Sequence, residues 1–514
     1  MFAWIFFLGK YLFVILSMML CFLTYKVFIK PLLNRWRYTR YENVKIVHTS
    51  EETEDLLTIP DESIVNRLSL ASRRVPEEEK SYDIQMMHIG KDYIHSLPGY
   101  KYMLFDIKNI NMRLFQSLIQ DKIDRFVPDT FYLGMLSKNS LPCRETKNTS
   151  FKMRTRIIKT CGIADLTSKL PLISNKLVKE IKAGYFTENW EKEFRRTIFQ
   201  ILGSLFLGKN FEKKIESIQD EGETLNSTAQ VLNSNMDSNG NFSFVDYYID
   251  TTKDSMNPFT ATISEGPGDK LDNIRRAVYS LVSYKEPDES SIFQKILKMG
   301  KFTKEEITDE VLSCLHLAFI TLCPTLISAI KELKDNDEIC QELLQDLNNT
   351  FDSEIENIER YFEEEKEISI KDKITLIGKY QPKEFLRAIQ ASQYLHYVVN
   401  ETLRLHCPAD GSLLYKVIEN FTVCKVPIPA DSLIRINFSS LHYDSLEWHS
   451  PKKFLPERFD PESDYFLRPA SNTRRFGESF IPFGVGDRGC PGKAMSILLL
   501  KVVLCLVSPF INSQ

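Results

Sequence analysis

Apolar residues recur at helical spacing along most of the chain, which predicts a mainly helical fold. The clearest stretches of this kind are 195–207, 273–285, 304–333 and 372–405. By contrast, 420–438 and a short stretch near Met103 have the apolar alternation of strands. The Asn- and Ser-rich region 224–241 predicts a loop, and the charged region 354–373 predicts a solvated connector. The expected fold class is therefore mainly α with small β-sheets.

The first thirty residues predict a membrane anchor. Residues 2–29 are strongly apolar, with charges only at Lys10 and Lys26, and about twenty apolar residues span a bilayer. Basic residues follow the apolar core, at Lys26, Lys30, Arg35, Arg37 and Arg40. By the positive-inside rule we expect a single-pass protein whose remaining residues face the cytosol. A cleaved signal peptide is the alternative, but no small-residue cleavage site follows the apolar run.

Composition narrows the function classes. Hydrophobic residues make up 43% of the chain, enough for a large core, and the formal net charge of −4 predicts no nucleic-acid partner. The ten cysteines show neither a disulfide framework nor zinc-type spacing. They fit a reducing compartment, where most would be packing residues.

One of these cysteines lies in a distinctive sequence, Phe483-Gly-Val-Gly486-Asp-Arg488-Gly-Cys490-Pro-Gly492. It reads F-x-x-G-x-R-x-C-x-G without a gap, and this pattern resembles the haem-thiolate loop of the cytochromes P450. The alternative is a surface loop with a free cysteine, which five fixed positions make improbable. The resemblance implies that Cys490 is the axial ligand of haem iron, because a thiolate donates electron density that favours O–O cleavage.

The resemblance also gives roles to the neighbours of Cys490. Gly484, Gly486 and Gly492 would let the backbone curl beneath a flat macrocycle with no Cβ in the way, following Phe483, the first position of the motif. Backbone amides aimed at the sulfur would tune its potential. Arg488 would reach a haem propionate as a planar donor.

A second motif has the E-x-x-R spacing of the K helix in the same superfamily. Glu401 and Arg404 lie three residues apart, so their side chains share one helix face and can pair. Arg458, in the segment Phe454-Leu-Pro-Glu-Arg-Phe459, would complete the network, as in the family's P-E-R-F segment. Alone, E-x-x-R is more often a surface helix pair, but the order and separation of the segments favour a structural network behind the haem loop.

The helix expected at 304–333 would be the oxygen-activating helix of the family. Its end at Lys331-Glu332-Leu333 places Thr321 at the oxygen-side threonine, although Ile320 replaces the usual acidic residue. Thr321 could still relay a proton through water. Pro324 has no N–H to donate to the carbonyl of Ile320, so we expect a kink beside the threonine. The alternative is a threonine that only packs in the core.

A weaker match concerns the haem propionates. Many family members carry W-x-x-x-R on the C helix, but the segment 151–159 has no tryptophan. Arg156 is its best candidate, with Arg154 as the alternate. The basic face of this segment, together with Lys493, would suit docking of an acidic flavoprotein reductase, although such faces are more often merely solvated.

The resemblance implies a single catalytic domain over 31–514 that binds haem b. It implies a monooxygenase of the endoplasmic reticulum membrane that inserts one oxygen atom from O2 into an apolar substrate such as a lipid, sterol or xenobiotic. Electrons would come from NADPH through NADPH-cytochrome P450 reductase, with cytochrome b5 as a further partner. Two alternatives stay open: a haem-thiolate peroxide isomerase or dehydratase, and a haem-binding protein without turnover.

Two further features of the sequence concern the subfamily and the completeness of the catalytic domain. Met153-Arg154, the segment 161–169, Ile320-Thr321 without an acid, and His442-Tyr-Asp-Ser-Leu-Glu-Trp448 together are similar to the orphan animal P450 family 20. Twenty-four residues follow Cys490, where family members usually continue with strands that complete the sheet. We therefore expect a domain shortened at its C-terminus, or a truncated gene product, which would favour the reading without turnover.

Overall fold

The computed structural model describes residues 2–25, 29–46, 84–91, 100–108, 117–118, 121–126, 140–147, 151, 155, 163–182, 190–220, 243–252, 268–283, 291–298, 302–354, 369–409, 411–469 and 471–511. The chain forms two compact units, of which the first contains residues 1–126 and 411–440 and the second contains 127–410 and 441–514. Each unit therefore combines segments that are far apart in sequence. The expectation of one catalytic domain over 31–514 stays a prediction.

The first unit contains two small sheets. Its strands are β1 (Val44–Ile46), β2 (Ile84–Lys91), β3 (Tyr100–Ile107), β4 (Ile123–Arg125), β5 (Tyr415–Val417), β6 (Phe421–Val423), β7 (Val426–Ile428) and β8 (Leu433–Ile436). Six of them form one sheet in the order β1-β2-β3-β8-β5-β4, and β6 and β7 form a hairpin. All four residues of β8 are buried, as expected for a central strand. The strands predicted near Met103 and within 420–438 are confirmed.

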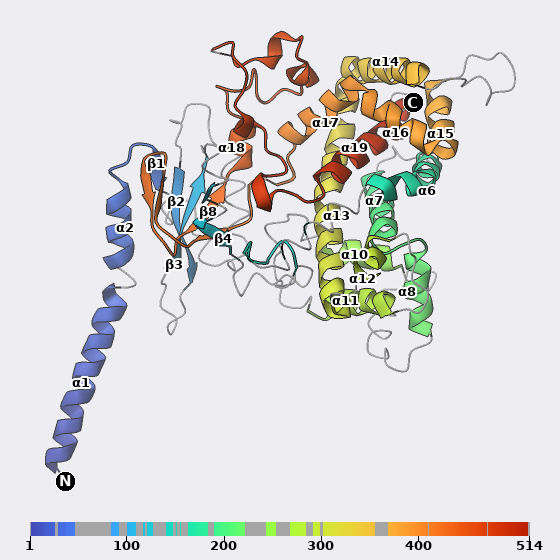
Figure 1. Cartoon of the computed structure of the whole chain (residues 1–514). Coiled ribbons are helices and arrows are strands. Elements are labelled where there is room, and N and C mark those ends of the chain that lie inside the picture. Colours follow the sequence, from blue (N-terminus) through green and yellow to red (C-terminus); the bar gives the residue numbers. More distant parts are fainter. Residues whose placement is uncertain are drawn as a thin grey trace. The chain divides into compact units, whose positions relative to one another are not determined.

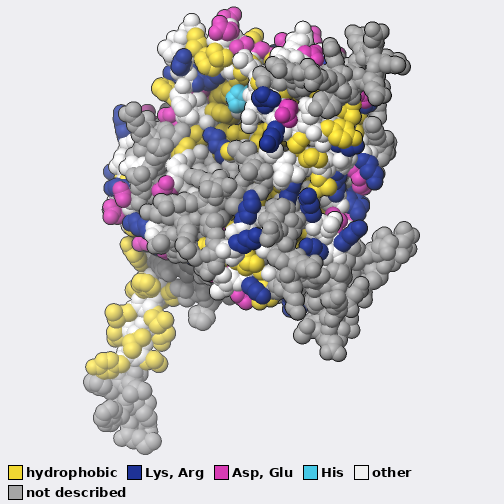
Figure 2. Space-filling view, turned by 45° about the vertical axis from the view of Figure 1, so that its right-hand side comes forward, with side chains coloured by type: hydrophobic (Ala, Val, Ile, Leu, Met, Phe, Trp, Pro, Cys, Tyr) yellow, Lys and Arg dark blue, Asp and Glu magenta, His cyan; other side chains and the backbone are white. Residues whose placement is uncertain are grey.

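The first unit also begins with two helices, α1 (Phe2–Thr24) and α2 (Lys30–Tyr38). The large apolar side chains of α1 from Tyr11 to Phe22 are exposed, with exposed fractions of 53 to 72%. In Figure 2 they form an apolar column at the lower left. Water-soluble proteins rarely expose a helix that is apolar on all sides, because such a helix is stable only when it is buried in protein or in a membrane. The exposed apolar surface of α1 therefore agrees with the predicted anchor.

The second unit is helical and is built around one long helix (Figure 1). Its helices are α6 (Ile163–Lys182), α7 (Trp190–Phe206), α8 (Phe211–Asp220), α10 (Phe244–Thr252), α11 (Gly268–Ser283), α12 (Ile292–Lys298), α13 (Lys304–Asp335), α14 (Asp337–Glu354), α15 (Ile370–Tyr380), α16 (Pro382–Ala391), α17 (Gln393–Leu405) and α19 (Lys493–Val507). The short helix α18 (Phe438–His442) crosses the boundary between the units.

The central helix α13 starts at a capping box. The side chain of Thr303 accepts from the amide of Glu306, and the Glu306 carboxylate accepts from the amide of Thr303. The residues 304–335 and 493–510 form helices long and apolar enough to cross a membrane, but 67% and 72% of their most apolar windows are buried. Both are therefore core helices: they pack against each other, α13 also packs against α7 and α11, and α19 also packs against α6.

The stretch predicted as continuously helical at 372–405 is instead three helices. The first break is at Gln381, followed by Pro382, which favours the first position of a new helix because it lacks an N–H. The second is at Ser392, whose hydroxyl accepts from the amide of Leu395 and caps α17. The helix predicted at 304–333 is confirmed, and those at 195–207 and 273–285 correspond to α7 and α11.

Candidate functional site

The segment that contains Cys490 is a tight loop leading into α19. The amide of Cys490 donates to the carbonyl of Phe483 at 2.8 Å, and the amide of Gly484 donates to the carbonyl of Ile481 at 2.9 Å. Gly484 and Gly486 both have φ of 65°, a backbone conformation that glycine adopts without strain. The backbone of the turn therefore favours glycine at both positions, and their role beneath a macrocycle stays a prediction.

The surroundings of the Cys490 sulfur favour a ligand. Solvent reaches the side chain, yet burial raises the pKa of the thiol, while a hydrogen bond from the backbone of Gly492 and the charge of Lys493 act to lower that pKa. A side chain open on one side and enclosed on the others has both properties. Gly492 is also the residue before α19, so the positive end of that helix faces the sulfur. Unlike Gly484 and Gly486, Gly492 has a φ of −88°, which any residue can adopt. Gly492 therefore contributes through its backbone amide, which donates to the Cys490 sulfur.

The structure places Arg488 against the segment 140–151. Its guanidinium donates to the hydroxyl of Thr146 at 2.7 Å and to the carbonyl of Arg144, and it lies 4.2 Å from the ring centre of Phe151. A cation held at the edge of the Cys490 loop is suitably charged for a propionate. Arg156 and its alternate Arg154 lie outside the described residues.

The structure brings Glu401, Arg404 and Arg458 together in a fully buried cluster. Arg404 donates to both carboxylate oxygens of Glu401 at 2.8 Å, and Nε of Arg458 donates to Oε1 of Glu401 at 3.1 Å. All three side chains are inaccessible to solvent. The remaining donors of Arg404 are used by the carbonyls of His442, Pro451 and Lys453. One carboxylate and several backbone carbonyls thus hold two guanidinium groups in place.

His442 connects this cluster to the cysteine loop, a role that the sequence analysis did not assign. Its carbonyl accepts from Arg404, and its Nε2 accepts from the amide of Ile481 at 3.1 Å. The ring is completely buried, and burial together with the charge of Arg404 lowers the pKa of His442 to about 3. The imidazole is therefore neutral, as an acceptor must be. The partners of His442, Arg404 and Ile481, are 38 and 39 residues away in sequence, so the sequence around His442 could not predict these contacts.

The helix α13 presents a partly open stripe on an otherwise buried surface. Each member of this stripe lies three or four residues from another member; they are Cys314, Leu317, Ala318, Thr321, Pro324 and Ser328. Ile320 is on the buried side, with an exposed fraction of 1%. The Thr321 hydroxyl donates to the carbonyl of Leu317 at 2.7 Å, so its proton is held by its own helix. Thr325 donates likewise to the carbonyl of Thr321 at 2.8 Å, close to the backbone position that Pro324 leaves without a donor.

These features fit a haem b held by Cys490. The sulfur is accessible, and an amide and a helix end favour its anionic form. The stripe on α13 belongs to the same unit and contains the hydroxyl proposed from sequence. In the part of the chain that the structure describes, no group of three or more His, Cys, Asp or Glu side chains could hold a metal ion.

Comparison with known proteins agrees with this arrangement. Residues 375–507 match the cytochrome P450 family. The chain is 37% identical to cytochrome P450 CYP82D47 of Panax ginseng over 113 residues, which are 22% of this chain and 29% of that protein. It is 30% identical to thromboxane-A synthase of Mus musculus over 138 residues, 27% of this chain and 24% of that protein. The chain thus spans less than a third of the length of these curated relatives.

The likeness in fold extends further than the likeness in sequence. The structure of a retinoic acid-bound cyanobacterial CYP120A1 aligns with 90% of this chain and 91% of its own, with a TM-score of 0.58 and 16% sequence identity. The matched sequence, residues 375–507, contains the Glu401 cluster and Cys490. The narrower resemblance to family 20 stays a prediction.

Proposed function

Because this chain belongs to the cytochrome P450 superfamily, we propose that it is a haem-thiolate monooxygenase with Cys490 as the axial ligand. The observation that carries the proposal is the accessible Cys490 sulfur at the start of α19, with the Gly492 amide directed toward it. Haem b, when bound, would supply the oxygen chemistry, in which one atom of O2 enters the substrate and the other is reduced to water.

The residues of the chain would hold the cofactor and deliver protons. Cys490 would be kept ionised by the Gly492 amide and the start of α19, and Arg488, with Arg156, would neutralise the propionates. Thr321 would hold a proton at its hydroxyl on the open face of α13. The Glu401 cluster would fix the loop mechanically, because it is buried and reaches the loop through His442 and Ile481.

The remaining parts of the reaction are proposed from the family. An apolar small molecule is the expected substrate, and NADPH-cytochrome P450 reductase, with cytochrome b5, would supply electrons. The exposed apolar helix α1 supports attachment to a bilayer, and we place the protein in the endoplasmic reticulum membrane with its body in the cytosol.

A peroxide isomerase or dehydratase is the second candidate, and one observation favours it. Ile320 occupies the place of the usual acid and is buried, while the Thr321 hydroxyl donates to its own helix. The proton relay that monooxygenation needs is therefore weakened. Isomerisation of a hydroperoxide needs neither this relay nor a reductase.

A reduced carbon monoxide difference spectrum tests the haem assignment. The purified protein should show the thiolate-type Soret band, and Cys490→Ala should lose it, whereas Cys505→Ala, a change at a buried cysteine on α19, should keep it. A Cys490→Ala protein that retained the band would contradict the assignment. NADPH consumption with reductase and a substrate panel then supports monooxygenation, and turnover of an added hydroperoxide without NADPH supports the isomerase.

A further inference from the structure

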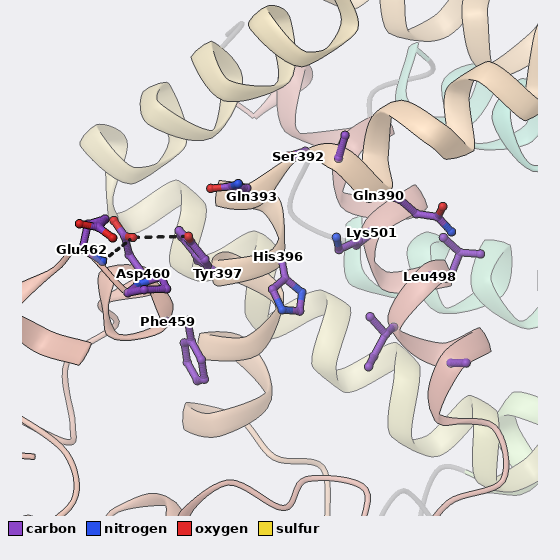
Figure 3. A pocket seen from close by; sticks show the side chains of 14 residues that line it. Gln390, Ser392, Gln393, His396, Tyr397, Phe459, Asp460, Glu462, Leu498 and Lys501 are labelled. Atoms are coloured by element: carbon purple, nitrogen blue, oxygen red, sulfur yellow. Dashed lines mark hydrogen bonds between the residues drawn. The ribbon is translucent and has the colours of Figure 1, made fainter. Parts of the chain in front are cut away.

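A pocket of about 770 Å³ lies in the second unit, and none of residues 483–492 lines it (Figure 3). Its walls are the end of α16, the first turn of α17, one face of α19 and the segment 459–462. The volume is in the range of small-molecule sites. The consecutive helices α16 and α17 thus meet the segment 459–462 and α19 around a space that nothing in the proposed reaction uses.

One wall contains a buried cation without an ion-pair partner. The side chain of Lys501 lines the pocket although its exposed fraction is only 6%, and its ammonium donates to the carbonyl of Ile389 at 3.2 Å. An ammonium has three N–H donors. Within the described residues no carboxylate forms an ion pair with it, and Asp346 acts only as a more distant charge. Because burying a charge is costly unless it is paired, an anion in the pocket would supply the missing partner.

His396, on α17, adds a second donor beside Lys501 of α19. Its Nε2 faces the amide of Asn400 at 3.0 Å, so Nε2 accepts and the ring proton is on Nδ1. Figure 3 shows the His396 ring and the Lys501 amine directed into the same space. Burial and, to a lesser extent, the charge of Lys501 lower the pKa of His396. Lys501 and His396 together therefore offer a cation and a neutral N–H donor to one group of a ligand.

The wall beyond Tyr397 has the opposite charge. Asp460 and Glu462 both line the pocket, and Asp460 accepts from the hydroxyl of Tyr397 at 3.5 Å and from the amide of Glu462 at 3.1 Å. The carboxylate of Glu462 is exposed. A purely anionic ligand that filled the pocket would be repelled by these carboxylates, and a purely cationic ligand would be repelled by Lys501. A ligand that carries one charge of each sign would be attracted by both groups of side chains.

We propose that this pocket binds a small zwitterion. Its carboxylate or phosphate would lie against Lys501 and His396, and its ammonium against Asp460 and Glu462. Phe459, Ile497 and Leu498, which also line the pocket, would contact an apolar link between the two ends.

Calorimetric titration of the haem-loaded full-length protein with matched probes tests the proposal. The zwitterions are 4-aminobutyrate, 6-aminohexanoate and 8-aminooctanoate, and the single-charge controls are hexanoate and hexylamine. At least one zwitterion should bind saturably, and about tenfold more tightly than either control, the difference expected for one charge-assisted contact. If no zwitterion binds, or if hexanoate binds as tightly, the proposal is wrong.

Variants locate the site. Lys501→Met keeps the buried stem but removes the charge, and Glu462→Gln removes the charge of an exposed group; each should weaken zwitterion binding about tenfold. Lys383→Met, an exposed lysine on α16 outside the pocket, is the matched control and should bind as the unmodified protein does. The Soret band and melting temperature verify folding. Unchanged binding in a folded Lys501→Met or Glu462→Gln protein would overturn the assignment.

Discussion

At the scale of single residues, the environment of Cys490 differs from that of the other cysteines. Burial raises the pKa of Cys323 to about 12 and that of Cys340 to about 11, and no backbone amide opposes it. At Cys490 the Gly492 amide and Lys493 do oppose it. The raised pKa values fit packing roles for Cys323 and Cys340, whereas the Gly492 amide and Lys493 favour the anionic form of Cys490.

The Glu401 cluster should behave as one structural unit. Arg404→Ala would leave the Glu401 carboxylate and Arg458 buried without their partner, at a cost on the order of 3–5 kcal/mol. We therefore expect this variant to express without haem or to aggregate. Arg474→Ala, a change at an exposed arginine in the same unit, should alter stability by no more than about 0.5 kcal/mol. Normal haem loading and an unchanged melting temperature in Arg404→Ala would count against a structural role.

His442 gives a pH dependence whose sign follows from its lowered pKa. The folded pKa is about 3 and the unfolded value about 6.5, so below pH 6.5 the unfolded state binds a proton that the folded state does not. Stability from neutral His442 is complete above pH 6.5 and decreases as the pH falls toward 3. Between pH 6.5 and pH 5 the loss should be about 2 kcal/mol.

The test compares the protein with His442→Gln, in which an amide oxygen can still accept from Ile481 but does not titrate. Urea unfolding at pH 7 and pH 5 should show a larger loss in the unmodified protein than in the variant. Carboxylates also titrate between pH 7 and pH 5, but they contribute equally to the losses of both proteins, so the difference between the two losses reports His442 alone. Equal losses would mean that His442 does not titrate during unfolding.

At the scale of elements, two neighbouring residues of α13 differ in their exposure to solvent. Thr321 belongs to the partly open stripe, whereas Ile320 points into the core. A helix rotates by about 100° per residue, so adjacent residues can have different surroundings. Because Ile320 itself is buried, a carboxyl group at position 320 would enter the core and not the partly open stripe.

Ile320→Asp should accordingly destabilise the fold. It removes a buried aliphatic side chain and places a carboxyl group in an apolar environment, at a cost of at least about 3 kcal/mol. Ala318→Asp is the matched control, because Ala318 belongs to the open stripe and its new carboxylate can be hydrated. The melting temperature of Ile320→Asp should be clearly the lower. Equal melting temperatures would show that position 320 accepts an acid.

The elements also show what the sequence could predict. Long amphipathic helices such as α7, α11 and α13 follow from apolar periodicity alone. The three-residue strand β5 was not predicted, because a strand that short has too few alternating positions to be distinguished from a loop. The breaks at Gln381 and Ser392 have local causes in Pro382 and a serine cap, signals that the apolar spacing of 372–405 concealed.

At the scale of the whole molecule, the chain leaves the first unit after residue 126 and returns to it for 411–440. The pairing of β3 with β8 joins residues more than 300 positions apart, for example Leu104 with Leu433. Sequence periodicity identifies strands but carries no information on such partners. The motifs at 401–404, 454–459 and 483–492 were predictable because the family resemblance supplied the long-range relationship.

Membrane topology is a property of the whole chain, and one exposed sequon can report it. Asn437, in Asn437-Phe-Ser439, is completely buried and donates to Asp106 at 2.9 Å, so it is inaccessible in the folded protein on either side of a membrane. Asn420, in Asn420-Phe-Thr422, is exposed at the start of the hairpin. Glycosylation of Asn420 therefore depends on the compartment.

With basic residues after α1, the body should be cytosolic and Asn420 unmodified. Treatment of the protein from eukaryotic cells with an N-glycan-removing enzyme should leave its electrophoretic mobility unchanged. A version in which a cleavable secretory signal replaces α1 is the positive control: its mobility should shift, and Asn420→Gln should reduce that shift. A shift in the unmodified protein that Asn420→Gln removes would place the body in the lumen, out of reach of a cytosolic reductase, and would leave the reductase-independent peroxide chemistry as the better proposal.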